Sequence, residues 1–257
     1  MNYYDQHLHT HFSYDSDADF LPYLEAFAGY IVTTEHFDLA NPVTKQDDAP
    51  DYQTYAQTID ELNKKYGNRI LKGIEIGYIA SEKERILAYL ADKTYDLKLL
   101  SVHHNGQFDY LDDFVADMDP NDIIPAYLSQ LEEAVATIPA NVFAHFDYGF
   151  RLFDLTPVDL KKFEPQLIRL FQAVINKQLA FEVNAKSAYL YHNLALYDYA
   201  IDLYQSLGGT LFTIGSDGHK LEHFRLHFDD LFSLLHKKGV TELATYQNGH
   251  VKMVPFP

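Results

Sequence analysis

The stretch Ile70–Val102 reads ILKGIEIGYIASEKERILAYLADKTYDLKLLSV, and its pattern decides the fold class. Two apolar runs rich in branched side chains, Ile70–Ile76 and Leu97–Val102, predict buried strands. Glu82–Asp92 lies between them and has the apolar spacing of a helix. A strand, a helix and a second strand in this order predict two parallel strands joined by a helical crossover.

The same alternation continues in both directions along the chain. Further apolar runs predict strands at Tyr3–His7, Tyr30–Thr34, Asn141–His145, Leu179–Val183 and Leu211–Ile214. Segments of helical spacing separate them, at Tyr52–Tyr66, Pro120–Thr137, Pro157–Lys177, Leu194–Leu207 and His223–Lys238. Helix-start signals occur in two places, Ser81 with Glu84 and Thr156 before Pro157. Seven strand–helix repeats in 257 residues predict a parallel sheet closed into a TIM-like barrel, with an open doubly wound sheet as the alternative.

The composition is that of a folded, acidic protein. There are 20 Lys and Arg against 37 Asp and Glu, a formal net charge of -17, which argues against nucleic acid or an anionic membrane surface as partner. The absence of Cys excludes disulfides and thiolate metal sites. The opening MNYYDQHLHTHF lacks the features of a secretory signal, and no apolar run approaches the roughly 18 residues of a membrane helix. We expect a soluble, cytoplasmic protein with one domain over residues 1–257, in which Leu39–Asp51 forms a loop at one barrel end.

Residue types that bind metals follow nearly every predicted strand. They are His7 and His9, Glu35 and His36, Glu75, His103 and His104, His145 and Asp147, Glu182 and Asn184, and Asp217 and His219. In a closed barrel the carboxyl ends of all strands surround one mouth, so these side chains would converge there. Imidazoles with carboxylates suit Zn, Mn or Fe, and carboxylates can bridge two cations. The sequence therefore predicts a cavity that holds more than one metal ion.

Two local patterns support this prediction. His7 and His9 are two residues apart on a predicted strand, so both imidazoles point to the same face. Glu75 lies between Ile74 and Ile76, where a buried carboxylate without a partner would be costly. A metal ion would explain both patterns.

The motif pieces also occur in a familiar order. His7-Leu8-His9-Thr10 is followed by Thr34-Glu35-His36, Gly73-Ile74-Glu75, Ser101-Val102-His103, Ala144-His145-Phe146-Asp147, Glu182-Val183-Asn184 and Gly215-Ser216-Asp217-Gly218-His219. This set resembles the PHP (polymerase and histidinol phosphatase) superfamily from Met1 to about His223. Within the superfamily, the chain looks like the stand-alone histidinol-phosphate phosphatases.

The resemblance implies a distorted (β/α)7 barrel with up to three divalent metal ions, Zn²⁺ first and Mn²⁺ or Fe²⁺ as alternatives. The implied ligands of the first metal are His7, His9, Glu75 and Asp217. Those of the second are Glu75, His103 and His145, and those of the third are Asp15, His36 and His219. Asp17 competes with Asp15, and His103 is favoured over His104 because it follows the Ser-Val pair.

The implied activity is hydrolysis of a small-molecule phosphate ester, L-histidinol phosphate, to L-histidinol and phosphate, a step of histidine biosynthesis. We expect a hydroxide that bridges the first two metals to attack phosphorus. The candidate general acids are Asp217, His104 and a metal-bound water. Candidate substrate contacts are Arg151 and Lys186 for the phosphate, Glu182 for the ammonium group, and His104 and His223 nearby.

Other functions remain open. A PHP-type protein-tyrosine phosphatase or another phosphoesterase would share much of the motif set. The charge of -17 disfavours an exonuclease, because a nucleic-acid track needs Lys and Arg. A non-catalytic metal-binding module is the least favoured, because every expected ligand position is filled. The sequence leaves the native metal and the oligomeric state undetermined.

Overall fold

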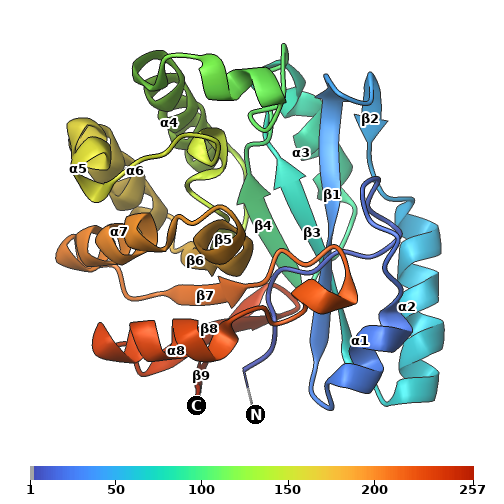
Figure 1. The fold of residues 1–257 in the computed structure, drawn as a ribbon. Helices are drawn as coiled ribbons and strands as arrows, with labels where there is room; N and C mark the ends of the chain where they lie inside the picture. Colours follow the sequence, from blue (N-terminus) through green and yellow to red (C-terminus); the bar gives the residue numbers. More distant parts are fainter. Residues whose placement is uncertain (1–2) are drawn as a thin grey trace.

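The computed structural model describes residues 3–257 as a strongly twisted sheet covered by helices (Figure 1). The sheet has seven strands in the order β2-β1-β3-β4-β5-β6-β7. Their bounds are Ile31–Asn41 (β1), Gln46–Asp48 (β2), Ile70–Gly77 (β3), Leu97–Ser101 (β4), Val142–Phe143 (β5), Ala180–Asn184 (β6) and Phe212–Gly215 (β7). All neighbours pair in parallel except β2, which is antiparallel to β1. The predicted α/β class with a mostly parallel sheet is confirmed.

Helices follow most of the strands. Their bounds are Phe20–Ala26 (α1), Tyr52–Tyr66 (α2), Lys83–Ala91 (α3), Pro120–Thr137 (α4), Pro157–Leu160 (α5), Glu164–Asn176 (α6), Leu194–Ser206 (α7) and Phe228–Lys237 (α8). The predicted bounds of α2 and α4 agree with the structure. Among the described residues, no helix combines the length and apolar character needed to cross a bilayer.

The closed barrel expected from the sequence does not form, because β7 and β1 are at separate points of an open sheet and an irregular segment lies between them. The strand predicted at Tyr3–His7 is absent, and a single parallel bridge joins Leu8, just after it, to Gly218. Asp217 N nevertheless donates to His7 O at 2.9 Å, and Thr34 N donates to Leu8 O at 2.7 Å, so the segment joins β7 to β1.

Side chains replace the missing ladder bonds of this segment. The Asp5 carboxylate accepts hydrogen bonds from His7 N at 3.2 Å and from Ser216 N at 2.9 Å, and the Tyr3 hydroxyl donates to Ile214 O at 2.8 Å. These bonds satisfy backbone groups that a regular strand would pair, so the first predicted strand stays irregular. The barrel is therefore distorted between its first and last strands.

Three helix starts differ from expectation. The predicted helix Pro157–Lys177 is interrupted by a 3-10 turn before α6, whose first turn contains Pro165, a residue without a backbone donor. The capping box expected from Ser81 and Glu84 does not form, because a 3-10 turn at Ala80–Glu82 precedes α3. The helix predicted from His223 begins at Phe228, after a left-handed residue at position 227. The Thr156 cap, in contrast, forms a capping box with Asp159.

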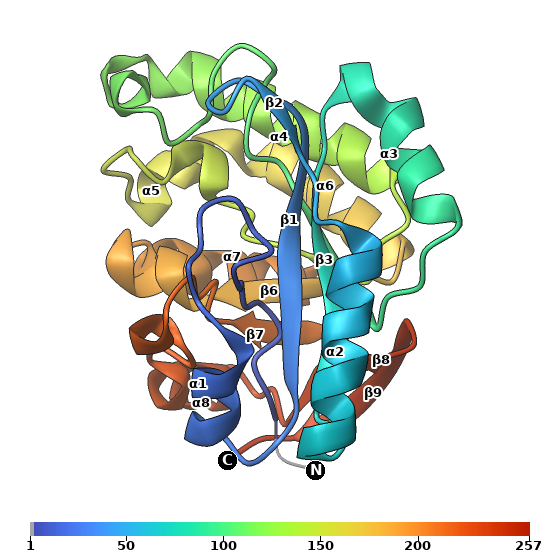
Figure 2. The ribbon, with the colours of Figure 1, turned by 90° about the vertical axis from the view of Figure 1, so that its right-hand side faces the viewer.

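A C-terminal hairpin, which the pattern did not predict, covers the end where the strands begin. β8 (Glu242–Gln247) pairs with β9 (His250–Pro255) through a turn in which Asn248 and Gly249 have φ of 51° and 74°. Such positive values suit a two-residue hairpin turn. In Figure 2 the hairpin lies at the end where β1 begins, opposite β2. Strand β2 and helix α1 were also not predicted, and β2 lies within the expected loop Leu39–Asp51.

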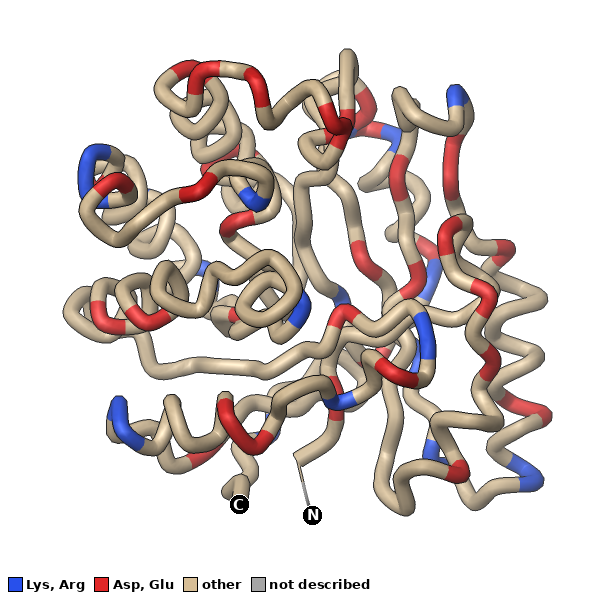
Figure 3. Tube along the Cα trace, in the orientation of Figure 1, with Lys and Arg blue, Asp and Glu red and all other residues tan. Residues whose placement is uncertain are grey.

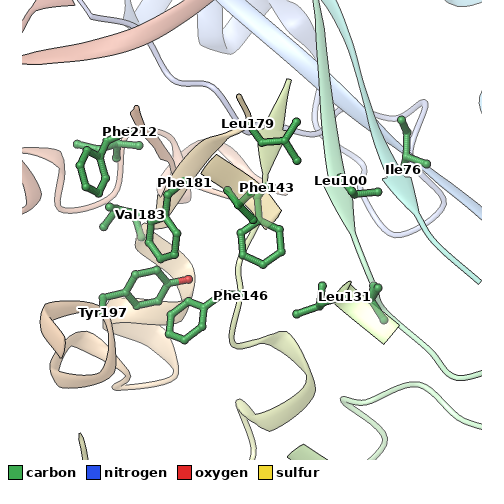
Figure 4. Close-up of a cluster of buried hydrophobic side chains, with 14 of the residues drawn as sticks. Ile76, Leu100, Leu131, Phe143, Phe146, Leu179, Phe181, Val183, Tyr197 and Phe212 are labelled. Carbon is green, nitrogen blue, oxygen red and sulfur yellow. The ribbon is translucent and has the colours of Figure 1, made fainter. Parts of the chain in front are cut away.

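Apolar side chains pack on both faces of the sheet, as in other parallel sheets. Figure 4 shows the aromatic part of the core under the helices, where Phe146 contacts Tyr197 edge to face with ring centroids 5.1 Å apart. A smaller cluster with Leu97, Leu99 and Tyr246 fills the barrel interior toward the hairpin. The main cluster contains residues from position 3 to position 256. This packing fixes the strands and leaves their carboxyl ends to carry polar side chains.

Candidate metal centre

The structure brings together all nine residues expected as metal ligands. They are His7, His9, Asp15, His36, Glu75, His103, His145, Asp217 and His219, and each contacts at least one of the others. They come from the irregular first segment, from the carboxyl halves of β1 and β3, and from the loops after β4, β5 and β7. All are buried except Asp15 and His219. Residues distant in sequence thus form one cluster.

Glu75 lies at the middle of this cluster and faces two histidine pairs. Its Oε1 is 2.6 Å from His145 Nε2 and 3.2 Å from His103 Nε2. Its Oε2 is 3.2 Å from His7 Nε2 and 3.5 Å from His9 Nε2. A carboxylate with one oxygen toward each pair has the arrangement needed to bridge two cations.

Three of the imidazoles form a hydrogen bond through Nδ1 with a side chain outside the expected ligand set. The pairs are His7 with Glu182 Oε1 at 2.7 Å, His103 with Asp38 Oδ1 at 2.8 Å, and His9 with Ser13 Oγ at 3.0 Å. An ionised carboxylate can only accept, so Nδ1 carries the proton and the Nε2 lone pair faces the cluster. This is the arrangement of metal-binding histidines, whose second nitrogen donates to a carboxylate or a similar group.

The loop after His9 is organised by Glu35. Its carboxylate accepts hydrogen bonds from Thr10 Oγ1 at 2.7 Å and from Ser13 Oγ at 2.7 Å. Because Ser13 gives its only proton to Glu35, its oxygen accepts from His9 Nδ1 and from the backbone N–H of His36. Glu35 therefore acts behind the cluster and keeps His9 in the tautomer that presents Nε2.

Asp38 is a member of the site that the sequence analysis missed. Its Oδ1 binds His103 Nδ1, and its Oδ2 is 3.4 Å from His36 Nδ1. Asp38 follows His36 by two residues on β1, so both side chains lie on the same face of the strand. That spacing was the signal by which it could have been found.

The third group of expected ligands lies at the rim. Asp15 Oδ2 is 3.0 Å from His219 Nε2, Asp15 Oδ1 is 3.6 Å from His36 Nε2, and the two Nε2 atoms are 3.3 Å apart. Among residues 3–257, Asp17 makes no ion pair with either imidazole, although it lines a cavity of about 380 Å³ beside them. The geometry favours Asp15 over Asp17.

Charge coupling keeps the central carboxylates ionised. Burial alone would raise the pKa of Glu75, but the imidazoles of His7 and His103 hold it well below its usual value. Burial likewise opposes ionisation of Asp217, yet Lys186 and His7 hold its pKa well below the usual range. Burial, followed by the charges of neighbouring imidazoles, lowers the pKa of His9. Against the effect of burial, the neighbouring carboxylates raise the pKa of His7 and of His103. Metal binding would therefore release protons from these imidazoles, since only the neutral nitrogen is a ligand.

Several buried polar atoms of the cluster have no hydrogen-bond partner within residues 3–257. They are Glu75 Oε2, His36 Nδ1, Asp38 Oδ2 and His145 Nδ1. Buried polar atoms without partners are costly. His7 Nε2 and His9 Nε2 also lie 3.1 Å apart, so that without a metal ion one of the two must carry a proton to bond the other. Divalent cations would satisfy such a donor set, and the His and carboxylate ligands suit Zn²⁺, Mn²⁺ or Fe²⁺.

Two cations beside this cluster agree with the expected phosphate contacts. Arg151 Nη2 is 3.3 Å from Asp217 Oδ2, and Lys186 Nζ is 3.1 Å from Asp217 Oδ1. The Arg151 guanidinium lies over the rings of Tyr148 and Tyr191, at 4.8 and 5.1 Å from their centroids. Its Nη1 is buried and has no hydrogen-bond partner in the described chain.

Two expected contacts are placed elsewhere. His104 forms no hydrogen bond or ion pair with the nine ligands in the described chain, and its Nδ1 accepts from Gly106 N at 3.1 Å. Glu182 uses Oε1 for His7 and Oε2 for the backbone N–H of His145, so its contacts favour orienting ligands over receiving the substrate ammonium.

His219 and His223 are four residues apart, a spacing that would place both side chains on one face of a helix, but no such helix forms. The backbone is extended at Lys220, and only a 3-10 turn at Leu221–His223 follows. His219 and His223 are therefore not on one helix face. No hydrogen bond or ion pair joins His223 to the cluster in the part of the chain that the structure describes.

Comparisons with known proteins agree with this site. A family model described as PHP domain matches residues 5–186. The histidinol-phosphatase of Lactococcus lactis subsp. lactis (strain IL1403) is 29% identical over 262 residues, covering 96% of this chain and 95% of the relative. A probable histidinol-phosphatase of Clostridium acetobutylicum is 24% identical over 245 residues, covering 90% and 92%.

A solved structure has the same fold. It is the crystal structure of the histidinol phosphate phosphatase from Lactococcus lactis subsp. lactis Il1403 complexed with Zn, L-histidinol and phosphate. It superimposes with a TM-score of 0.85 and 25% sequence identity, covering 96% of this chain and 98% of that one. With the fold, the ligand cluster and the family model in agreement, the chain belongs to the PHP domain family.

Proposed function

We propose that this protein is a metal-dependent phosphomonoesterase that hydrolyses L-histidinol phosphate to L-histidinol and phosphate. The observation that carries the proposal is Glu75, whose two oxygens face two histidine pairs beside the cations Arg151 and Lys186. The Lactococcus lactis relative, whose structure holds Zn, L-histidinol and phosphate, supports the substrate and favours Zn²⁺. We also propose a cytoplasmic location, which the absence of Cys supports.

Divalent ions held by the nine ligands supply a water of lowered pKa as the nucleophile and positive charge toward the phosphoryl oxygens. The chain's own part is to hold these ligands in place. Glu182, Asp38 and Ser13 each fix one imidazole by its Nδ1, so that Nε2 faces inward without rearrangement. Such preorganisation lowers the cost of reaching the transition state.

Arg151 and Lys186 stabilise the charge of the transferred phosphoryl group. Both lie against Asp217, and the buried guanidinium keeps Nη1 free to donate to a phosphoryl oxygen. A guanidinium suits this role because its donors match the spacing of phosphate oxygens. Together they add local positive charge to a chain whose formal net charge is -17.

We propose that a water molecule donates the proton to the leaving alkoxide. The pKa of Asp217 is held well below its usual value, against the effect of burial, by Lys186, His7 and Arg151, so its carboxyl group holds no proton near neutral pH. His104 forms no hydrogen bond or ion pair with the nine ligands in the described chain, and burial lowers its pKa. Neither residue is therefore assigned as the general acid.

A nucleic-acid substrate has no support. Asp and Glu are distributed over most elements, and Lys and Arg are interspersed among them without forming a continuous track (Figure 3). Phosphodiester backbones are bound through such basic tracks. A small phosphate ester fits this charge distribution better.

The proposal is tested by phosphate release from a panel of substrates by protein purified without chelator. The panel holds L-histidinol phosphate, a phosphotyrosine peptide, AMP and a short single-stranded DNA, and the metal content is measured on the same sample. We expect a strong preference for L-histidinol phosphate with about two to three metal ions per chain, as the three ligand groups require. Equal, feeble rates across the panel in metal-loaded protein would contradict the substrate assignment.

A further inference from the structure

Asp109 is a buried carboxylate beside the metal centre that has no cationic partner. It is 7% exposed, and no Lys, Arg or His of residues 3–257 forms an ion pair with it. Its Oδ1 accepts hydrogen bonds from Leu111 N at 2.8 Å and from the Tyr148 hydroxyl at 3.1 Å. No hydrogen bond within the described chain involves Oδ2, so one oxygen has its acceptor capacity free.

A carboxylate in this setting favours a bound cation. Burial raises the pKa of Asp109, and only hydrogen bonds and the imidazole of His103 oppose that effect. A buried charge is retained at low cost only where an opposite charge accompanies it. No positively charged side chain of the described residues pairs with Asp109 Oδ2, so a cationic ligand could bind there.

The ring of Tyr148 lies between Asp109 and the metal centre. The ring of Tyr148 packs against the imidazoles of His103 and His145, with centroids 4.8 and 5.2 Å away, and its hydroxyl reaches Asp109. The backbone fixes this placement, because Tyr110 N donates to His103 O at 2.9 Å. Asp109 therefore lies in the loop after β4, next to the backbone of the expected ligand His103.

We propose that Asp109 binds the ammonium group of the substrate and makes the site selective for phosphate esters of amino alcohols. The inference rests on the proposed function, since it takes the phosphate to lie at the metal ligands. In L-histidinol phosphate the amino group lies three bonds from the ester oxygen, so a phosphate at the cluster brings the ammonium toward the rim. Glu182, the other buried carboxylate considered for this role, has both oxygens engaged.

The carboxylates on the opposite rim suit this role less well. Asp17 and Asp19 line the cavity beside His219, but both are exposed. Asp19 also uses its side chain to cap α1 through the N–H of Phe20. An exposed carboxylate is already hydrated and discriminates weakly between charged and neutral ligands, whereas a desolvated one discriminates strongly.

The test compares substrates that differ by one ammonium group. The steady-state kcat/KM is measured for L-histidinol phosphate, 2-aminoethyl phosphate and ethyl phosphate with the metal-loaded wild type, Asp109→Asn, Asp109→Glu and the exposed neighbour Asp113→Asn as matched control. We expect Asp109→Asn to lose about 10- to 100-fold on the two ammonium substrates, mainly through KM, and little on ethyl phosphate. Asp109→Glu should retain part of the preference, and Asp113→Asn all of it.

The outcomes separate this inference from the proposed function. Equal losses on all three esters would overturn the inference, because they indicate a structural role, and so would an unchanged preference in folded Asp109→Asn protein. A wild type that does not distinguish 2-aminoethyl from ethyl phosphate would overturn it as well. A wild type that distinguishes this pair through Asp109 but prefers the phosphotyrosine peptide to L-histidinol phosphate would support the inference and contradict the proposed function. Thermal melting and metal content confirm that each variant is folded and loaded.

Discussion

Nδ1 of His7 lies 2.7 Å from Oε1 of Glu182, on the side of the imidazole that faces away from Glu75. The pair is fully buried, and Glu182 also accepts the backbone N–H of His145 at 2.8 Å. One carboxylate therefore positions two residues of the cluster, although it does not belong to the expected ligand set. This relationship makes Glu182 the outer residue whose replacement is most informative.

Glu182→Gln should weaken metal binding while leaving the fold intact. Glutamine keeps an acceptor for His7 but removes the negative charge that raises the basicity of the imidazole. We expect kcat/KM to fall about 10- to 100-fold, the usual range for such outer partners, and metal to be lost sooner on dialysis. Glu84→Gln, on the exposed side of α3, is the matched control. If Glu182→Gln retained wild-type activity and metal content, Glu182 would have no role in supporting the metal ligand His7.

Removal of the metals should abolish activity and lower thermal stability together. The chain then retains Glu75 Oε2 and His36 Nδ1 at 3.2 Å from each other without a hydrogen bond, and His145 Nδ1 with no hydrogen-bond partner in the described chain. Metals that bind only the native state stabilise it by mass action, so the melting temperature should fall on chelation and recover when Zn²⁺ is added back. Activity or a melting temperature unaffected by prolonged chelation would contradict a metal centre here.

His7→Ala should lower kcat by orders of magnitude in protein that remains folded. The imidazole contacts Glu75, His9 and Glu182, so its loss removes a ligand and leaves its partners unsupported. Circular dichroism and kcat on the same sample check this. Turnover near that of the wild type would place His7 outside the ligand set.

Asp15→Asn and Asp17→Asn should differ in metal content. Asp15 contacts the imidazoles of both His36 and His219, whereas Asp17 only lines the neighbouring cavity. We expect Asp15→Asn to lose up to one metal ion per chain and most of its activity, and Asp17→Asn to resemble the wild type. The metal content of each variant is measured after gel filtration. The reverse result would identify Asp17, and not Asp15, as the metal ligand.

Arg151→Lys should raise KM and lower kcat for phosphate esters. Lysine keeps the charge but cannot reproduce the planar set of donors that reaches Asp217 and Ser187 and leaves Nη1 free. We expect a loss of about 10- to 100-fold in kcat/KM, consistent with one charge-assisted hydrogen bond. Inhibition by inorganic phosphate should weaken in parallel. Unchanged phosphate inhibition would mean that Arg151 supports only the structure.

The sequence by itself determined the strand–helix alternation, the ends of α2 and α4, and the residue types at the strand ends. These features could be predicted because they depend on local periodicity and on residues such as Pro120, which favours the start of a helix within its own first turn. The ligand set followed because parallel strands bring their carboxyl ends to one edge wherever they occur in the chain. For the same reason the family was recognisable from spaced motifs.

Only the tertiary structure decided how these parts meet. It replaced the first strand by a segment held through Asp5, brought His103 but not His104 into contact with Glu75, and placed Asp15 beside two imidazoles. It also brought Asp38 into contact with His103 and placed Asp109 behind Tyr148, where no motif marked them. Each of these outcomes depends on the distance and direction between side chains remote in sequence, and such distances are set by packing of the whole barrel, which no local pattern encodes.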